Sequence, residues 1–403
     1  MRVRTGDPEM AREINRALIL HLLRQHDSIP RAEIARHLKL SKVTVSTIVS
    51  GLLKNEHVVE LGEGAALEKG GRRPIMLSLN IFSKYVIGVD IGTTNTVAAV
   101  GNLKGTVLKK IHVPTTRNHS VENILEQVSH LVDEIIIQSE VDKKRIIGVG
   151  LSVAGQIEKD SGLIIFSPHF NWRNVHIAKL VEDKTGFKTI ADNCTRAMAL
   201  GEVWYGNGKN VSNLLFINIG YGIGSALVLD GKIYNHHSEF GHTFITKKKI
   251  QCPCGKYGCI EVVASGNAIE HQANKHMDAE NNEWITVKMA AERAEKGDTV
   301  AKKIFYEAGR YLGRGISILA NFITPEKIII GGGVSSVGDL LLKPILSEFN
   351  KNTMEVVKAK TQVCISSLGM EAGVYGAISM ALNDMFFDYG LVNQQLLSNR
   401  LEL

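Results

Sequence analysis

Apolar residues at the start of the chain recur at the spacing of helices that bury one face. Leu18 and Leu22 lie one turn apart, which predicts an amphipathic helix over residues 9–25. Pro30 interrupts this pattern and suits the first turn of a second helix over residues 31–37. The chain therefore begins with two short helices separated by a break.

A third helix is expected over residues 42–54, with Ser41 as its N-cap. Its apolar residues follow the i, i+3, i+4, i+7 rule and define one buried stripe: Val45, Ile48, Val49 and Leu52. The opposite face is small and polar, and Val43 supplies a methyl-bearing side chain on it. Such a face fits a DNA major groove, where hydroxyls reach base edges. A helical module that binds protein is the alternative interpretation.

Two apolar segments after the third helix, residues 57–61 and 74–79, predict short strands around a loop, which together form a wing. The loop carries adjacent arginines between glycine and proline, a basic finger suited to a narrow minor groove. Other basic residues are expected near phosphates, where they set register. The residues that we expect to contact DNA are Arg31, Ser41, Lys42, Val43, Thr44, Ser46, Thr47, Ser50, Arg72 and Arg73.

The rest of the chain repeats one pattern, a buried strand that runs into a glycine-rich turn. The copies read YVIGVDIG at 85–92, LLFINIGYGIG at 214–224 and IIIGGG at 328–333. The first two lie about 130 positions apart and indicate a duplicated α/β lobe with a cleft between the copies. Apolar periodicity also predicts helical structure over 286–320, and a last helix over 371–382 that packs back on the body.

Positive charge is concentrated in the first eighty residues. They carry 13 Lys and Arg against nine Asp and Glu, whereas the remaining 323 residues carry 34 against 32. A small basic head on a near-neutral body suits contact with nucleic acid. No apolar run is long enough to span a bilayer, and the chain begins without the apolar core of a signal peptide. We therefore expect a cytoplasmic protein with no membrane partner.

Three cysteines and a histidine gather in the stretch SEFGHTFITKKKIQCPCGKYGCIE, residues 238–261. Cys252, Cys254 and Cys259 lie within eight positions, and His242 stands ten residues upstream. Three thiolates and one imidazole form a complete ligand set for structural Zn²⁺, which is the expected cofactor. Free thiols or disulfides are the alternative, and a cytoplasmic setting disfavours the latter.

The stretch from Glu239 to Glu261 resembles the signature of the ROK family, which holds bacterial sugar kinases and sugar-responsive repressors. The resemblance covers essentially the whole chain. The run RAEIARHLKLSKVTVSTIVSGLL, residues 31–53, resembles the winged helix-turn-helix of ROK repressors, which ROK kinases lack. The resemblance therefore implies the regulator branch, which holds repressors responsive to xylose and N-acetylglucosamine.

The family resemblance implies an α/β fold, with an actin-like ATPase (ribonuclease-H-like) body of two lobes behind a winged helix-turn-helix domain. We expect that domain over residues 1–80 and the first lobe over 81–195, completed by the C-terminal helix at about 371–390. The second lobe, with the zinc motif, is expected over 196–370. The glycine turns would be vestigial nucleotide loops, at Asp90, Gly92, Thr94, Gly220, Gly222, Gly224 and Gly332.

The same resemblance implies a sugar pocket, in which Trp172 either packs near the ligand or belongs to the core. The residues implied to bind the effector are Asn171, Asn193, Glu239, His242 and Glu261. Alignment on Ala199–Glu202 places Cys194 where ROK kinases have their catalytic Asp. A thiol is mostly protonated near neutral pH, and Asp192 stands two positions too early to replace the missing base. Asn218 and Tyr221 also depart from the kinase pattern.

These observations predict a sugar-responsive transcriptional repressor, not an enzyme. Its head would bind operator DNA, and its cleft would bind a small carbohydrate without phosphorylating it. Because DNA half-sites usually come in pairs, a homodimer or homotetramer is expected. Two alternatives stay open. One is a bifunctional ATP-dependent sugar kinase that also binds DNA, and the other is a repressor whose body docks a protein, such as a transport component.

Overall fold

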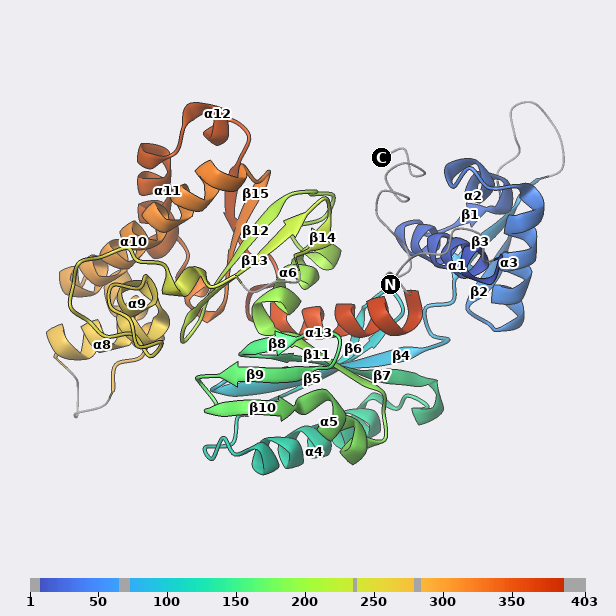
Figure 1. The fold of residues 1–403 in the computed structure, drawn as a ribbon. Coiled ribbons are helices and arrows are strands. Elements are labelled where there is room, and N and C mark those ends of the chain that lie inside the picture. The colour runs from blue at the N-terminus through green and yellow to red at the C-terminus, as the bar shows by residue number, and fades with distance from the viewer. Residues whose placement is uncertain (1–7, 65–72, 235–237, 279–283, 388–403) are drawn as a thin grey trace.

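The computed structural model describes residues 8–64, 73–234, 238–278 and 284–387 of the 403-residue chain. It shows a small N-terminal head beside a body of two larger lobes (Figure 1). Within the described residues, no helix has both the length and the apolar character needed to cross a membrane.

The head consists of three helices and a small three-stranded sheet of order β1-β3-β2. Its elements are α1 (Pro8–Gln25), β1 (Ile29–Pro30), α2 (Arg31–His37), α3 (Lys42–Lys54), β2 (Val58–Glu63) and β3 (Ile75–Leu79). The three helices and the two longer strands confirm the sequence predictions. Strand β1 was not predicted, because two residues are too few to show a period and the strand exists only through its antiparallel pairing with β3.

Local chemistry explains the helix-turn-helix part of the head. The Ser41 hydroxyl accepts a hydrogen bond from the Thr44 amide at 3.0 Å and so caps α3, as predicted. The predicted stripe of Val45, Ile48, Val49 and Leu52 is buried. On the opposite face the Val43 side chain is 76% exposed. The periodicity of α3 therefore fixes which of its faces meets solvent.

The two lobes of the body share one strand plan. The first sheet has the order β11-β7-β4-β5-β6, and the second has the order β14-β13-β12-β15-β16. In both sheets the first two strands form an antiparallel hairpin, β4–β5 and β12–β13. In both sheets, the first strand in chain order also pairs in parallel with the fourth in chain order, which is β4 with β7 and β12 with β15. The matching order confirms the predicted duplication.

The strands of the body fall into three sheets. The first sheet holds β4 (Tyr85–Ile91), β5 (Asn95–Asn102), β6 (Val107–Pro114), β7 (Ile146–Val153) and β11 (Thr189–Asn193). The second holds β12 (Leu214–Ile219), β13 (Ile223–Leu229), β14 (Lys232–Ile233), β15 (Lys327–Gly331) and β16 (Gln362–Ile365). A small antiparallel sheet holds β8 (Gln156–Glu158), β9 (Leu163–Ser167) and β10 (Trp172–His176).

Helices cover these sheets and connect the lobes. The α-helices are α4 (Val121–Ser139), α5 (Ile177–Thr185), α6 (Cys194–Tyr205), α7 (Glu261–Ala264), α8 (Gly266–His276), α9 (Val287–Glu295), α10 (Thr299–Ile323), α11 (Asp339–Asn352), α12 (Glu355–Lys358) and α13 (Ala372–Leu382). Shorter turns are η1 (Lys143–Arg145), η2 (Phe240–His242), η4 (Gly333–Val337), η5 (Gly369–Glu371) and the π-helical η6 (Asn383–Phe387). The helical structure expected over 286–320 is divided into α9 and α10 at Gly297, whose φ is +105°.

Helices α6 and α13 cross in backbone contact, and α13 lies along the first sheet (Figure 1). A Cβ at Gly201 of α6 would lie 2.9 Å from the Ala372 carbonyl oxygen, so no side chain fits at that point. A Cβ at Gly88 of β4 would likewise lie 2.8 Å from Ile378 of α13. The predicted C-terminal helix is confirmed, and it is wedged between α6 and the first sheet.

Candidate functional site

A cleft of about 1240 Å³ is lined by residues from both lobes and from the start of α6. All seven residues of the expected nucleotide loops line it: Asp90, Gly92, Thr94, Gly220, Gly222, Gly224 and Gly332. Four of the five residues implied to bind an effector also line it: Asn193, Glu239, His242 and Glu261. The fold therefore brings together residues from six separate stretches of sequence, at positions 90–94, 193, 220–224, 239–242, 261 and 332.

Asn193 is the N-cap of α6 and ties that helix to the first lobe. Its Oδ1 accepts hydrogen bonds from the amides of Thr195 at 2.9 Å and Arg196 at 3.3 Å. Its Nδ2 donates to the carbonyl oxygen of Gly155 at 2.7 Å. A ligand that engages the Asn193 amide must therefore compete with, or build on, the bonds that start α6.

The two glutamates of the cleft are each oriented by a protein donor. Gln156 of β8 donates through Nε2 to Glu239 Oε1 at 3.0 Å and so connects the small sheet of the first lobe to the second lobe. Glu261 Oε2 accepts the amide of Ile223 at 2.9 Å. An ionised carboxylate offers about four acceptor positions, so both glutamates keep capacity for the hydroxyls of a sugar.

His169 and Tyr221 belong to the cleft, although sequence reasoning did not assign either to the ligand site. Both line the cleft, and their rings meet edge to face with centroids 5.6 Å apart. Burial lowers the pKa of His169, against a smaller opposing effect of Glu261. The pair joins a turn of the first lobe to the second glycine turn. The sequence signal that could have identified His169 is its position in the loop 168–172, which also holds the expected residue Asn171.

Asn171 does not lie in the cleft, where it was expected to contact the effector. It is exposed, has a φ of +56° in the turn before β10, and does not line the cleft. The left-handed turn directs it outward, whereas His169, two positions earlier, faces the cleft. Trp172 proves to be a core residue: it is 4% exposed, stacks on Phe170 at 4.7 Å and donates to the His119 carbonyl oxygen at 2.8 Å.

Two groups near the start of α6, Cys194 and Asp192, are poorly suited to proton abstraction. Burial, together with the neighbouring Asp90, raises the pKa of the Cys194 thiol to about 12. Asp192 is 4% exposed, accepts a 2.7 Å hydrogen bond from Arg196 Nε and does not line the cleft. Burial raises the pKa of Asp90 to about 6, and its Oδ1 accepts the Ser152 hydroxyl at 2.5 Å.

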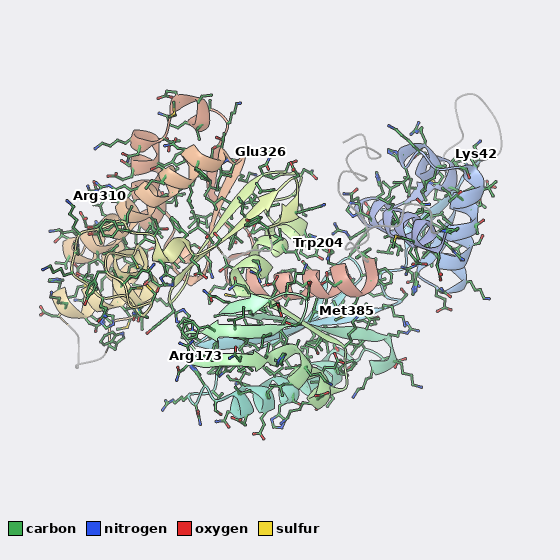
Figure 2. The ribbon with its side chains drawn as sticks, in the orientation of Figure 1. Lys42, Arg173, Trp204, Arg310, Glu326 and Met385 are labelled. Carbon is green, nitrogen blue, oxygen red and sulfur yellow. The ribbon has the colours of Figure 1, made fainter. Side chains whose placement is uncertain are left out.

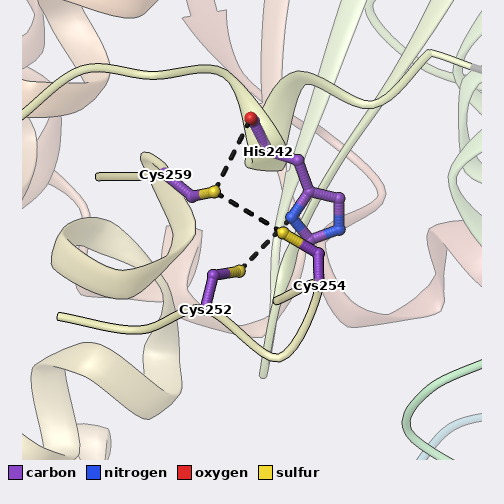
Figure 3. A group of neighbouring side chains, drawn as sticks. All are labelled: His242, Cys252, Cys254 and Cys259. Carbon is purple, nitrogen blue, oxygen red and sulfur yellow. Dashed lines mark hydrogen bonds between the residues drawn. The ribbon is translucent and has the colours of Figure 1, made fainter. Parts of the chain in front are cut away.

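The predicted metal ligands form one compact cluster (Figure 3). Ligand atoms of His242, Cys252, Cys254 and Cys259 all lie within 4.8 Å of one another. Cys254 Sγ is 3.7 Å from Cys259 Sγ, and Cys252 Sγ is 3.5 Å from His242 Nδ1. A tetrahedron with metal–sulfur bonds of 2.3 Å and metal–nitrogen bonds of about 2.0 Å has edges of about 3.8 and 3.5 Å. A disulfide needs about 2.05 Å. The cluster therefore fits a metal ion.

The cluster also shapes one wall of the cleft. Gly255 and Gly258 have φ values of +90° and +79°, which turn the short loop back toward His242. Glu261 follows two residues after Cys259 and begins α7, and His242 and Cys254 themselves line the cleft. An ion held here would therefore stiffen the segment that positions Glu261.

Five of the residues expected to contact DNA are exposed on one helix of the head. Lys42, Val43, Ser46, Thr47 and Ser50 are exposed on α3, and Figure 2 shows Lys42 on the part of the head that faces away from the lobes. That placement leaves the polar face of α3 open to a large partner.

Other candidates in the head have local partners. The Thr44 and Ser41 hydroxyls lie 2.8 Å apart, which makes Thr44 part of the helix cap. Arg31 forms an ion pair with Glu60 at 3.0 Å. Arg73 is exposed, and Arg72 lies outside the described residues.

Comparisons with known proteins give one consistent result. The ROK family model matches residues 86–384. A xylose repressor from Caldicellulosiruptor bescii is 30% identical over 393 residues, which cover 94% of this chain and 98% of its own. A crystal structure of a ROK family transcriptional regulator, described as a homolog of the E. coli Mlc protein, has a TM-score of 0.81 at 25% identity and covers 98% of this chain and 100% of its own.

A kinase gives a shorter match. The structure of a ROK family glucokinase from Streptomyces griseus, in complex with glucose and AMPPNP, has a TM-score of 0.67 at 29% identity. It covers 73% of this chain and 98% of its own. The two regulators are thus similar to almost the whole chain, whereas the glucokinase leaves about a quarter of it unmatched.

Proposed function

Because this chain belongs to the ROK family, we propose that it is a sugar-responsive transcriptional repressor. The observation that carries the proposal is the combination of a head and a cleft in one chain. The head presents an exposed polar helix face, and the lining of the cleft includes two oriented glutamates and a thiol at the start of α6. The end-to-end similarity to proteins named as repressors and regulators supports the same conclusion.

The head would bind operator DNA through α3 and the wing. Ser46 and Ser50 would reach base edges in the major groove, and the Val43 methyls would meet a thymine methyl. Lys42 would sit near a phosphate. Arg73, at the base of the wing, would reach toward the minor groove. These roles rest on the exposure of the five residues and on the geometry that winged helix-turn-helix heads share.

The cleft would bind a small carbohydrate without phosphorylating it. Asn193, Glu239, His242 and Glu261 would meet its hydroxyl groups, because amides, imidazoles and carboxylates pair readily with vicinal hydroxyls. Phosphoryl transfer needs a carboxylate base on the attacking hydroxyl. Cys194, with a pKa of about 12, remains protonated near pH 7 and does not supply one.

The metal of the cluster would be Zn²⁺ in a structural role. His242, Cys252, Cys254 and Cys259 offer the closed four-ligand set that structural zinc prefers, with no position left for water. The ion would supply rigidity to the loop before Glu261. It would take no part in chemistry.

A homodimer or homotetramer would present two or more heads to DNA. A single winged module makes few base contacts, and paired half-sites double them. The effector would act by binding one arrangement of the heads better than another, because an equal affinity for both would switch nothing.

The proposal is tested in two steps with the full-length protein. A duplex is first enriched by the protein from a random-sequence pool, and its binding is then measured with D-xylose, D-glucose and N-acetylglucosamine present in turn. We expect one sugar to change the DNA affinity about tenfold or more, in the range that allosteric coupling typically spans. No enrichment of any duplex would contradict the DNA-binding half of the proposal, and no effect of any sugar would contradict the effector half.

The second candidate function is a sugar kinase that also binds DNA. The observation that favours it is the first glycine turn, because Asp90, Gly92 and Thr94 all line the cleft. An assay of ATP-dependent phosphorylation on hexoses, pentoses and amino sugars separates the two candidates. Turnover that disappears in Asp90→Asn would establish the kinase. Calorimetry that gives no heat with any sugar, but tight binding to a transporter domain, would instead favour a body that docks a protein.

A further inference from the structure

Helix α6 reaches from the cleft to the head. Its first residue, Cys194, lines the cleft, and its last turn holds Trp204, which lies under the guanidinium of Arg24 in α1. Figure 2 shows Trp204 on the side of the body that faces the head. We propose that α6 carries the state of the cleft to the DNA-binding head, through the stack of Arg24 on Trp204. This inference rests on the proposed function, because it concerns how the effector site regulates DNA binding.

The cleft end of α6 touches both lobes. Asn193, its N-cap, is tied to Gly155 of the first lobe at 2.7 Å. Thr195 Oγ1 accepts a hydrogen bond from Asn218 Nδ2 of the second lobe at 3.4 Å, and its side chain fills the space beside Gly224. Any change in the angle between the lobes must therefore break one of these contacts or move the start of α6.

The middle of α6 is held too tightly to absorb such a movement. Gly201 lies in backbone contact with α13, so the two helices have no layer of flexible side chains between them there. Glu202 is fully buried and accepts the Ser366 hydroxyl at 2.5 Å, together with the amides of Asn207 at 2.7 Å and Leu368 at 3.2 Å. A displacement at one end of α6 is therefore passed along the helix as a rigid shift.

The head end of α6 is a specific contact inside a shared core. Arg24 Cζ lies 3.9 Å from the ring centroid of Trp204, which is 9% exposed, and 5.8 Å from that of Phe387. Burial lowers the pKa of the Arg24 guanidinium, and its Nε is buried without a hydrogen-bond partner among the residues that the structure describes. The aromatic face thus supplies the electrostatic partner for a charge that is partly removed from water.

The head receives the shift through α1. Arg24 stands in the last turn of α1, and α1 packs directly on α3. Buried residues of all three head helices belong to the same apolar cluster as Trp204 and Phe387. Rotation of Trp204 would therefore change the energy of one orientation of α1, and hence of α3, relative to another.

The main test removes the stack and leaves both binding surfaces intact. Arg24→Met removes the positive charge from a half-buried position of α1. The control, Arg12→Met, removes a positive charge from an exposed position of the same helix. DNA affinity is measured with the pool-selected duplex, with and without D-xylose, D-glucose or N-acetylglucosamine. Sugar affinity is measured separately by calorimetry. Arg24→Lys tests whether a cation alone restores the contact.

We expect Arg24→Met to retain sugar and DNA affinities within about threefold of the wild-type values, while the effect of sugar on DNA affinity falls from about tenfold or more to less than about twofold. Arg12→Met should keep the full effect, and Arg24→Lys should recover part of it. An unchanged effect of sugar in Arg24→Met would overturn the inference and leave the proposed function standing.

A second test needs neither sugar nor DNA. Trp172→Phe with Trp284→Phe leaves Trp204 as the remaining tryptophan of the three in the chain. In that background Thr195→Val removes the hydrogen bond to Asn218 at the cleft end of α6. We expect Thr195→Val to shift the fluorescence emission maximum of Trp204. The shift should be lost when Arg24→Met is added. A Trp204 fluorescence emission spectrum that is unchanged by Thr195→Val would contradict the inference, whatever the outcome of the sugar assays.

Discussion

At the scale of single residues, the cleft combines carboxylates that keep hydrogen-bond acceptor capacity with a thiol that stays protonated. The Cys194 thiol stays protonated because it is buried beside Asp90, and Asp192 is committed to Arg196. Glu239 and Glu261 are instead oriented by Gln156 and by the Ile223 amide, and they keep acceptor capacity. The chemical character of the site therefore follows from burial and hydrogen bonding around a few carboxylates and one thiol.

Asp90 should make the stability of the protein depend on pH. Burial raises its pKa from 3.8 to about 6, so the folded state holds a proton that the unfolded state has lost between these values. The stability contributed by this group is present below about pH 4 and is lost as the pH rises through 6. The shift corresponds to about 3 kcal/mol at most.

Asp90→Asn keeps an acceptor for the Ser152 hydroxyl and removes the titration. Relative to wild type, the variant should gain stability between pH 4 and 6 and keep a gain of about 2–3 kcal/mol at pH 7. The measurement is urea unfolding at each pH, with Asp133→Asn, an exposed position on α4, as the matched control. Parallel curves for the wild type and Asp90→Asn would contradict the assignment.

The Cys/His cluster should lose its metal when one ligand is removed. Cys252 is 2% exposed and its Sγ lies 3.5 Å from His242 Nδ1. Cys252→Ser should reduce the metal content from about one ion per chain to less than about 0.2 and lower the thermal midpoint, because ion binding contributes to folding. Cys364→Ser, outside the cluster, should keep both values. Elemental analysis measures the metal content per chain, and full metal content in Cys252→Ser would exclude this ligand set.

At the scale of elements, two helices provide the surfaces and contacts on which the proposed function depends. Helix α3 is capped by Ser41, buried along one stripe and exposed along the other, which is the pattern of a helix that enters a groove. Helix α6 begins in the cleft, crosses α13 at a glycine and ends against the head. Each helix has a role because its two ends, or its two faces, meet different surroundings.

Lys42 should act on DNA affinity without choosing a sequence. It stands at the first position of α3 and is exposed, which places its charge near a phosphate when the helix lies in the groove. Lys42→Ala should weaken binding to selected and unselected duplexes alike, and it should reduce the slope of log affinity against log salt by about one. Lys351→Ala, on α11 of the second lobe, is the control. Loss of affinity for the selected duplex alone would assign Lys42 to base contact.

Two glycines in helices should respond oppositely to alanine. A Cβ at Gly201 would lie 2.9 Å from the Ala372 carbonyl oxygen and 3.0 Å from the Gly376 amide nitrogen, whereas a Cβ at Gly51 of α3 would meet no atom within 4 Å. Gly201→Ala should destabilise the protein by about 1–3 kcal/mol, because the α6–α13 contact must open. Gly51→Ala should stabilise it by about 0.5–1 kcal/mol. Denaturant midpoints measure both, and equal effects would refute the close crossing.

At the scale of the whole molecule, a duplicated body surrounds one cleft and a small head packs on the same core. Buried residues of the head and of the body form one continuous apolar cluster that includes Leu18, Leu103 and Phe386. The lobes are also joined across the cleft by the pair Gln156–Glu239 and by the rings of His169 and Tyr221. A ligand that bound in the cleft would therefore act on a body whose parts are already in contact.

The full chain should assemble. The proposed function needs at least two heads on DNA, so sedimentation equilibrium should give a mass of at least about twice the 44.2 kDa of one chain. The same measurement with the pool-selected duplex should show two or more chains per duplex. A stable single chain on the duplex would contradict the paired-head proposal.

Much of this architecture was accessible from the sequence because it depends on neighbours along the chain. The stripe of α3, its Ser41 cap and the repeated strand–glycine turns follow from spacing alone, and the spacing of three cysteines suffices to predict their cluster. Such features need only a few residues and the geometry of one element. They were therefore predicted with nearly the observed boundaries.

The contacts that give these elements a function were decided by tertiary structure. Asn171 is exposed outside the cleft and His169 lines it, although they lie two positions apart, because Asn171 itself adopts a left-handed backbone conformation. Arg24 and Trp204 meet from positions 180 residues apart. Side-chain patterns along the sequence specify which elements form and which faces they bury. Contacts between faces that are distant in sequence form only when the elements pack. The raised pKa of Cys194 and the proposed path from the cleft to the head both depend on such contacts.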